Sequence, residues 1–166
     1  MNIHPLFVHF PIGILVLYTA FEILRFKILT RQAYYFPLKA ILVIAGTLTG
    51  LLTLSTGEMA EHIVLATEPG KKDLIEMHAM FGGATITLYA IIAGYYLAIW
   101  LKQSGYFMGL VNNSLVLKLV KIISPLVIPL SAVGLVTITI TGGLGASIVY
   151  GPEVDPFVTF IYHLFF

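Results

Sequence analysis

The stretch Leu119–Ala146, LVKIISPLVIPLSAVGLVTITITGGLGA, decides the fold, because its only charged residue is Lys121. A helix needs about 20 mostly apolar residues to cross the hydrocarbon core of a bilayer, and this stretch is longer than that. Three further apolar stretches are long enough as well, and they run from about residue 6 to 29, 37 to 57 and 78 to 101. The sequence therefore predicts an all-α integral membrane protein, a bundle of four transmembrane helices.

The composition of the 166-residue chain supports the same class. Its hydrophobic share is 58%, its mean hydropathy is +0.97, and only 10% of its residues are charged, against about 25% in soluble domains. So few charges cannot cover a soluble globule of this size. A net charge of +1 excludes the basic surface that nucleic-acid binding requires. Without cysteine, disulfides, thiolate zinc sites, iron–sulfur clusters and c-type haem attachment are excluded too.

No internal repeat, low-complexity tract or linker divides the chain, so we expect a single domain over residues 1–166. The amino-terminal region lacks both a basic start and a small-x-small cleavage site, which argues against a cleaved signal peptide. The last segment, Val154–Phe166, is apolar and aromatic but too short to span a bilayer. We expect that segment to lie at the membrane interface or against the bundle.

Basic residues are distributed unequally among the connections. Only Lys71 and Lys72 lie between the second and third spans, whereas seven basic residues flank the other two connections: Arg25, Lys27, Arg31, Lys39, Lys102, Lys118 and Lys121. Cytoplasmic connections carry the excess of Lys and Arg in membrane proteins. Both termini are therefore predicted to lie outside the cytoplasm.

The same orientation places most other polar side chains on the outer side. They include seven of the eight acidic residues and all five histidines: His4, His9, His62, His78 and His163. Glu22 is the exception, and Arg25 follows it at a helical spacing that allows an ion pair. One interpretation is that these residues form a functional site on the outer side. The other is that the outer loop is simply more polar than the rest of the chain, without a functional role.

The most specific stretch runs from His4 to Gly13, HPLFVHFPIG. Pro5 suits the first turn of a helix, whereas Pro11 removes the hydrogen bond to the carbonyl of Phe7 and should kink or delay the helix. His9 is then held beside this defect. Ionisable residues inside a span indicate function by default, although His9 could simply bond the freed carbonyl.

Each of two histidines precedes a glycine by four residues, His9 before Gly13 and His78 before Gly82. Residues at this spacing share a helical face. A side-chain-free patch beside an imidazole suits a flat macrocycle, and imidazole is a common axial ligand of haem iron. The alternative is that these glycines let membrane helices approach each other closely.

A second candidate site follows the second span. Glu58, Glu61 and His62 can share one face of a helix, which resembles half of a carboxylate–histidine site for Zn, Mn or Fe. The segment lacks the first histidine of the H-x-x-E-H protease motif, so a zinc protease is excluded. A solvated acidic helix end is the alternative interpretation.

Taken together, these motifs resemble one bacterial family of small four-helix membrane proteins, domain of unknown function 2231. The motifs are the HPxxVHFPIG start, the TGExAE segment Thr56–Glu61, His78 with Gly82, and the glycine-rich segment Gly142–Gly151. The resemblance covers essentially the whole chain. It implies a four-helix fold in the bacterial inner membrane and leaves the activity open.

The resemblance also bears on the histidines. The family's motif histidines correspond to His4, His9 and His78, whereas His62 and His163 lie outside the motifs. Many relatives carry a histidine in the glycine-rich motif, where this chain has Gly142 and Gly143. If that histidine is a ligand in relatives, this chain must use another. Some relatives are fused to c-type cytochrome domains, which associates the family with electron transfer.

The leading hypothesis is a b-type cytochrome-like electron-transfer protein. Haem b would lie between His9 and His78 in the outer half of the bundle, with His4 or His62 as reserve ligands and Gly13 and Gly82 beside the macrocycle. The chain would exchange electrons with a quinone or an extracytoplasmic redox protein, as a redox subunit rather than a stand-alone enzyme.

Two other functions stay open. One is a non-haem metal-binding membrane protein that uses Glu58, Glu61, His62 and His78. The other is a cofactor-free accessory subunit of a larger membrane complex. A channel or transporter is less favoured, because Glu22 is the only acidic residue within the inner half of the spans.

Overall fold

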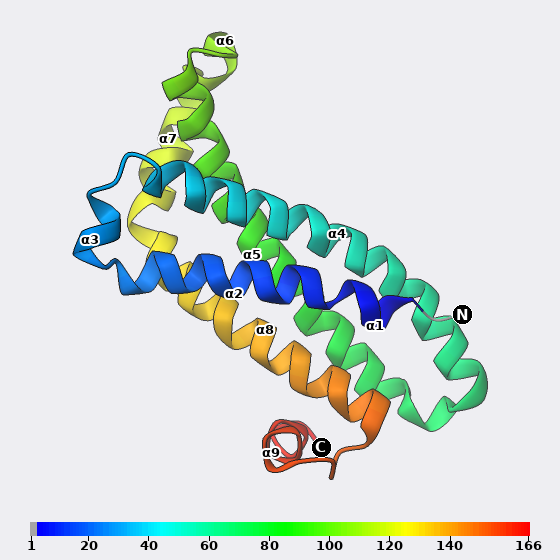
Figure 1. Ribbon diagram of the computed structural model, residues 1–166. Helices are drawn as coiled ribbons and strands as arrows, with labels where there is room; N and C mark the ends of the chain where they lie inside the picture. The colour runs from blue at the N-terminus through cyan, green and yellow to red at the C-terminus, as the bar shows by residue number, and fades with distance from the viewer. Residues whose placement is uncertain (1–2) are drawn as a thin grey trace.

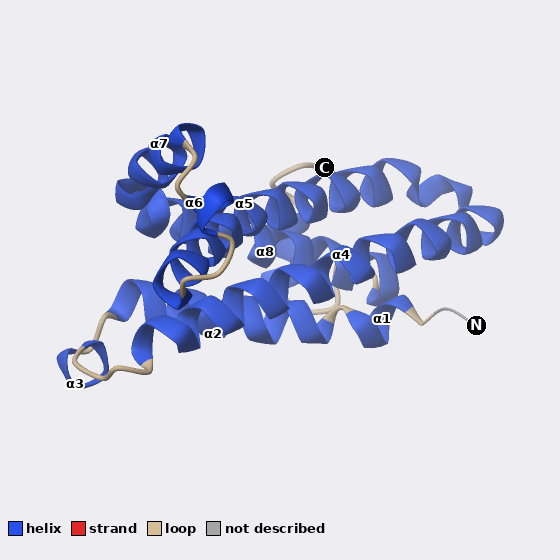
Figure 2. Cartoon of the chain, turned by 90° about the horizontal axis from the view of Figure 1, so that it is seen from above, coloured by secondary structure: helices blue, strands red, loops and turns tan. Residues whose placement is uncertain are grey.

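The structure, a computed structural model, describes residues 3–166 (Figure 1). Four helical segments are long and apolar enough to cross a membrane. No strand occurs among the described residues, and short loops join the helices (Figure 2). The predicted all-α class is confirmed, and these four segments are the candidate membrane spans. The elements are α1 His4–Phe7, α2 His9–Leu24, α3 Lys27–Thr30, α4 Tyr35–Thr67, η1 Pro69–Lys71, α5 Lys72–Ser104, α6 Met108–Val111, α7 Ser114–Ile123, η2 Ser124–Leu126, α8 Val127–Tyr150 and α9 Pro156–Tyr162.

Four long helices, α2, α4, α5 and α8, form the bundle. Both α2 and α5 pack against α4 and α8. Helix α1, the α4–α5 connection and the connection into α9 lie at one end of the bundle, which we call the terminal end (Figure 1). Helices α3 and α6 lie at the opposite end, which we call the loop end.

Two of the bundle helices are longer than a bilayer requires. Both α4 and α5 contain 33 residues, and at 1.5 Å per residue each is about 50 Å long, against about 30 Å of hydrocarbon core. The spans predicted at 37–57 and 78–101 are therefore parts of longer helices. Backbone hydrogen bonding continues past the end of an apolar run, so Glu58–Thr67 extend α4 rather than forming a loop.

Helices α1 and α2 together form the first candidate span, His4–Leu24, and Val8 between them keeps helical backbone angles, φ −61° and ψ −28°. Pro11 has no N–H for the carbonyl of Phe7; the hydroxyl of Thr53 on α4, which donates to the carbonyl of Thr49 at 2.9 Å, lies 3.4 Å from that carbonyl. The predicted freed carbonyl is thus present, whereas the predicted kink stays a prediction. The helix α2 then ends at Leu24, earlier than the predicted residue 29, and Arg25 follows in the left-handed conformation with φ 40°.

The fourth span changes its type of helix along its length. Helix α7 changes to the 3₁₀ turn η2 around Pro125 before α8 begins at Val127. After α8, the short helix α9 packs against α8 through Ile161, which is 4% exposed and lies in one apolar cluster with Leu74 and Leu144. The carboxy-terminal segment thus contacts the bundle. Its predicted position at the membrane interface stays a prediction.

The interior of the bundle is apolar at its centre and polar toward both ends. Fully buried side chains at the centre include Leu15, Val43 and Ile92. Tyr89 is also fully buried, and its hydroxyl forms a 2.7 Å hydrogen bond with Thr19 of α2. Within residues 3–166, every buried side-chain nitrogen or oxygen has a hydrogen-bond partner. The polar groups described next are therefore integrated into the packing.

Candidate functional site

At the terminal end, two histidines from separate elements meet. His4 of α1 and His78 of α5 place their ring centroids 6.3 Å apart, with the ring planes at 88°. Nδ1 of His4 lies 3.1 Å from Oγ1 of Thr56, and Nδ1 of His78 lies 3.0 Å from the carbonyl oxygen of Thr141. We call His4 and His78 the histidine pair.

These contacts bear on how the protons are arranged on the two rings. The Thr141 carbonyl can only accept, so Nδ1 of His78 carries the proton. The Thr56 hydroxyl donates to the carbonyl of Thr53 at 2.9 Å, so its oxygen can accept from Nδ1 of His4, and the His4 ring also has a hydrogen bond with the Thr53 backbone. In a neutral His78 with this tautomer, the lone pair is on Nε2. Metal-binding histidines show the same arrangement, in which the other ring N–H donates to the protein.

Glycines on the two neighbouring helices make room for these rings. A Cβ at Gly57 of α4 would lie 3.2 Å from Cε1 of His4, and a Cβ at Gly145 of α8 would lie 3.0 Å from Cε1 of His78. Real Cβ atoms rarely come so close to another atom. Larger residues at either position would push the imidazole away from its present place.

The structure brings His4, rather than His9, to His78. His9 is the first residue of α2, and its side chain is exposed on the bundle surface. Gly13 is exposed as well, and a Cβ there would meet no heavy atom within 4 Å. Gly82, in contrast, is half-buried beside other side chains. The two glycines therefore do not flank one shared surface.

The predicted carboxylate–histidine group lies on α4 where it extends past the apolar stretch. Glu58 and His62 are exposed, and Glu61 is half-buried. Across residues 3–166, no three His, Asp or Glu side chains gather closely enough to hold a metal ion. His78, proposed as a further member of this group, is instead in contact with His4.

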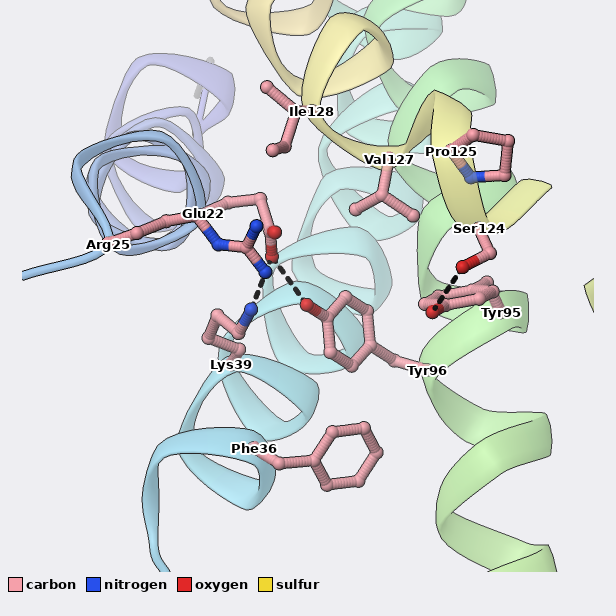
Figure 3. Close-up of a pocket in the computed structure, with 10 residues that line it drawn as sticks. All are labelled: Glu22, Arg25, Phe36, Lys39, Tyr95, Tyr96, Ser124, Pro125, Val127 and Ile128. Carbon is pink, nitrogen blue, oxygen red and sulfur yellow. Dashed lines mark hydrogen bonds and ion pairs between the residues drawn. The ribbon is translucent and has the colours of Figure 1, made fainter. Parts of the chain in front are cut away.

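A second polar site lies at the loop end. Nζ of Lys39 on α4 lies 2.7 Å from Oε2 of Glu22 on α2, and the two residues are 5% and 2% exposed. Tyr96 of α5 donates a hydrogen bond to the same oxygen, as does Tyr18 at 3.4 Å (Figure 3). The Lys39 ammonium also lies 4.8 Å from the centroid of the Tyr35 ring. One carboxylate thus links α2, α4 and α5.

Sequence reasoning missed this arrangement. It assigned Arg25 as the neighbour of Glu22 and treated Lys39 as a basic residue flanking a span. A signal was available: Glu22 lies within one apolar stretch and Lys39 at the start of the next. Opposite charges buried in adjacent spans pair with each other, because unpaired charges in hydrocarbon are costly.

Beside the Glu22–Lys39 pair is a cavity of about 430 Å³. We call this cavity the ionic pocket. It opens between α2, α4, α5 and the η2–α8 segment, and Figure 3 shows the side chains that surround it. Its lining residues are Glu22, Arg25, Phe36, Lys39, Tyr95, Tyr96, Ser124, Pro125, Val127 and Ile128.

Comparison with known proteins gives one match. The model of a family described as "Predicted membrane protein (DUF2231)" matches residues 1–155. No curated protein and no solved structure matches the chain.

Proposed function

Because the chain belongs to the DUF2231 family of predicted membrane proteins, we propose a function for a multi-pass membrane protein: binding haem b at the histidine pair and transferring electrons through it. The contact between His4 and His78 carries this proposal. Two imidazoles from different parts of the chain face the same small region, and each is oriented through Nδ1 by a threonine. Oriented imidazoles of this kind are typical ligands of metal centres.

The number of ligands favours haem over a bare ion. A haem iron takes one or two axial ligands from the protein, because the porphyrin supplies the other four. A metal ion held by side chains alone needs three or four of them, and residues 3–166 contain no such group. The pair His4 and His78 therefore matches the ligand set of a b-type haem.

A porphyrin beside His78 requires neighbouring side chains to move. Next to Gly82 these include Leu54 and Thr141, whose Cδ2 and Cγ2 atoms lie 3.7 Å from where a Cβ of Gly82 would be. Both atoms are ends of side chains and not backbone. Haem would supply one-electron chemistry, while the chain supplies axial ligation and an apolar environment. The Thr141 carbonyl keeps the His78 ring oriented.

The distribution of basic residues supports an orientation for this site. The loop end carries most of the Lys and Arg residues, so the positive-inside tendency directs it to the cytoplasm. The histidine pair then faces the extracytoplasmic side of a bacterial inner membrane. A quinone or an extracytoplasmic redox protein is the partner that would exchange electrons there.

The test is an absorption spectrum of the detergent-purified protein, first oxidised and then reduced with dithionite. A sample incubated with added haem serves as a second preparation. We expect a Soret band and sharp α and β bands after reduction. A colourless protein that also fails to take up added haem would overturn the proposal.

A further inference from the structure

The ionic pocket at the loop end has no role in the proposed haem site, which lies at the opposite end of the bundle. Its lining is amphipathic. Its apolar lining residues are Phe36 on one side and Pro125, Val127 and Ile128 on the other, while charged and hydroxyl groups converge between them from α2, α4 and α5 (Figure 3). A ligand that fits such a lining has a polar headgroup and an apolar body.

The buried part of the pocket is already neutral. Lys39 compensates the charge of Glu22, and Tyr96 and Tyr18 add hydrogen bonds to the same carboxylate oxygen. A cationic ligand would therefore compete with an ammonium that is fixed at 2.7 Å. The pair instead contributes a rigid floor to the pocket, with the Lys39 ammonium held between α2 and α4.

Arg25 supplies the charge that remains. It lines the pocket, and its guanidinium points inward past Glu22 toward Lys39 (Figure 3). Within residues 3–166, none of the salt bridges involves Arg25. With Lys39 and Glu22 cancelling each other, the lining has a net charge of +1.

The backbone at Arg25 is unusual as well. This residue follows the last turn of α2 with φ 40°, in the left-handed region, where glycine or asparagine normally ends a helix. An arginine there costs conformational energy. Strained residues of this kind cluster at ligand sites, and here the strain occurs in the residue that brings a cation into the pocket.

We propose that the ionic pocket binds a phosphate oxyanion carried by an amphiphile, with Arg25 as its main ligand and Lys39 and Tyr96 behind it. Arginine suits phosphate because its planar fork donates two parallel hydrogen bonds. Basic pockets between transmembrane helices are common sites for anionic lipid headgroups. The apolar side chains of Val127 and Ile128 would contact the body of the amphiphile.

The experiment measures the thermal unfolding midpoint of the full chain in detergent during three titrations. The ligands are phosphatidylglycerol, zwitterionic phosphatidylcholine and inorganic phosphate. The test variant is Arg25→Gly, because glycine fits the left-handed backbone and removes only the side chain. Arg31→Ala, an exposed arginine outside the pocket, is the matched control, and Arg25→Lys keeps the charge without the fork.

We expect phosphatidylglycerol to raise the unfolding midpoint of the wild type and of Arg31→Ala until the midpoint reaches a plateau. Phosphatidylcholine should not raise the midpoint of either protein. Arg25→Gly should weaken the apparent affinity at least tenfold, since a charge-assisted hydrogen bond is lost, with Arg25→Lys in between. If inorganic phosphate alone produces the full shift, the ligand is free phosphate rather than lipid. The proposal would be overturned if the wild type and Arg25→Gly bound phosphatidylglycerol equally well. It would also be overturned if the wild type bound phosphatidylglycerol and phosphatidylcholine equally well.

Discussion

Nζ of Lys39 lies 2.7 Å from Oε2 of Glu22, and both side chains are almost completely buried. The contact joins α2 to α4, and the Tyr96 hydroxyl adds α5 to the same carboxylate. A buried ion pair is costly to desolvate. Once formed, however, it makes the loss of either partner costly, because the other charge is left alone in an apolar environment.

The first prediction concerns this pair. Replacing Lys39 with Met should lower the free energy of unfolding by about 3–5 kcal/mol, because the Glu22 carboxylate is left buried without its counter-charge. The double variant Glu22→Gln with Lys39→Met should recover most of that loss. Equilibrium unfolding in mixed detergent micelles measures both values.

A matched control is available for this experiment. Lys72 and Glu76 also form an ion pair, at 3.6 Å, but both side chains are more than half exposed. Lys72→Met should therefore change the free energy of unfolding by less than about 1 kcal/mol. Equal effects of Lys39→Met and Lys72→Met would contradict the assigned role of the buried pair.

The second prediction concerns the glycines of α8. Gly145→Ala adds a methyl group 3.0 Å from Cε1 of His78, so the ring must shift and the protein should lose about 1–3 kcal/mol of stability. Its affinity for added haem should fall as well. Gly142→Ala is the control, because a Cβ there meets nothing within 4 Å. Thermal unfolding and haem titration of the two variants should separate them clearly; indistinguishable results would contradict the packing described.

The third prediction concerns the proline in the first span. Pro11→Ala restores an N–H that can bond the carbonyl of Phe7, so the helical hydrogen bonds should continue from α1 into α2 without the bond that proline omits. Amide hydrogen exchange across residues 3–12 should slow. Pro5→Ala, in the first turn of α1, should leave exchange in this region unchanged. Unchanged or faster exchange in Pro11→Ala would show that the missing N–H of Pro11 does not weaken the helix here.

The fourth prediction concerns orientation. The chain contains no cysteine, so single cysteines can be introduced without background. Gly70→Cys at the terminal end should react with a membrane-impermeant thiol reagent in intact cells, whereas Gln103→Cys at the loop end should react only after lysis. Labelling in the opposite pattern would place the histidine pair on the cytoplasmic side.

Much of the fold could be predicted from the sequence, because apolar length determines which segments cross a bilayer. The four candidate spans and the freed carbonyl of Phe7 follow directly from that rule and from the missing N–H of proline. Helix ends were harder to predict. Residues 58–67 continue α4 because helical hydrogen bonds form in water as well as in lipid, and hydropathy does not report on them.

The site was only partly predictable. The sequence indicated that His78 would face a histidine on the first span, but it favoured His9 over His4. His9 is exposed, whereas His4 is half-buried, and the contact of His4 with Thr56 depends on how α1 lies against α4. The partner of Glu22 likewise depends on how the helices pack, because Arg25 lies beyond the end of α2 while Lys39 comes from another helix.

The most direct test of the central claim is a haem titration of three variants, followed by Soret absorbance: His4→Ala, His78→Ala and His9→Ala. The account predicts that His4→Ala and His78→Ala lose stoichiometric haem binding or their low-spin reduced bands, while His9→Ala, whose side chain is exposed, keeps both. Unchanged haem binding in His4→Ala and His78→Ala would contradict the histidine pair as the haem site.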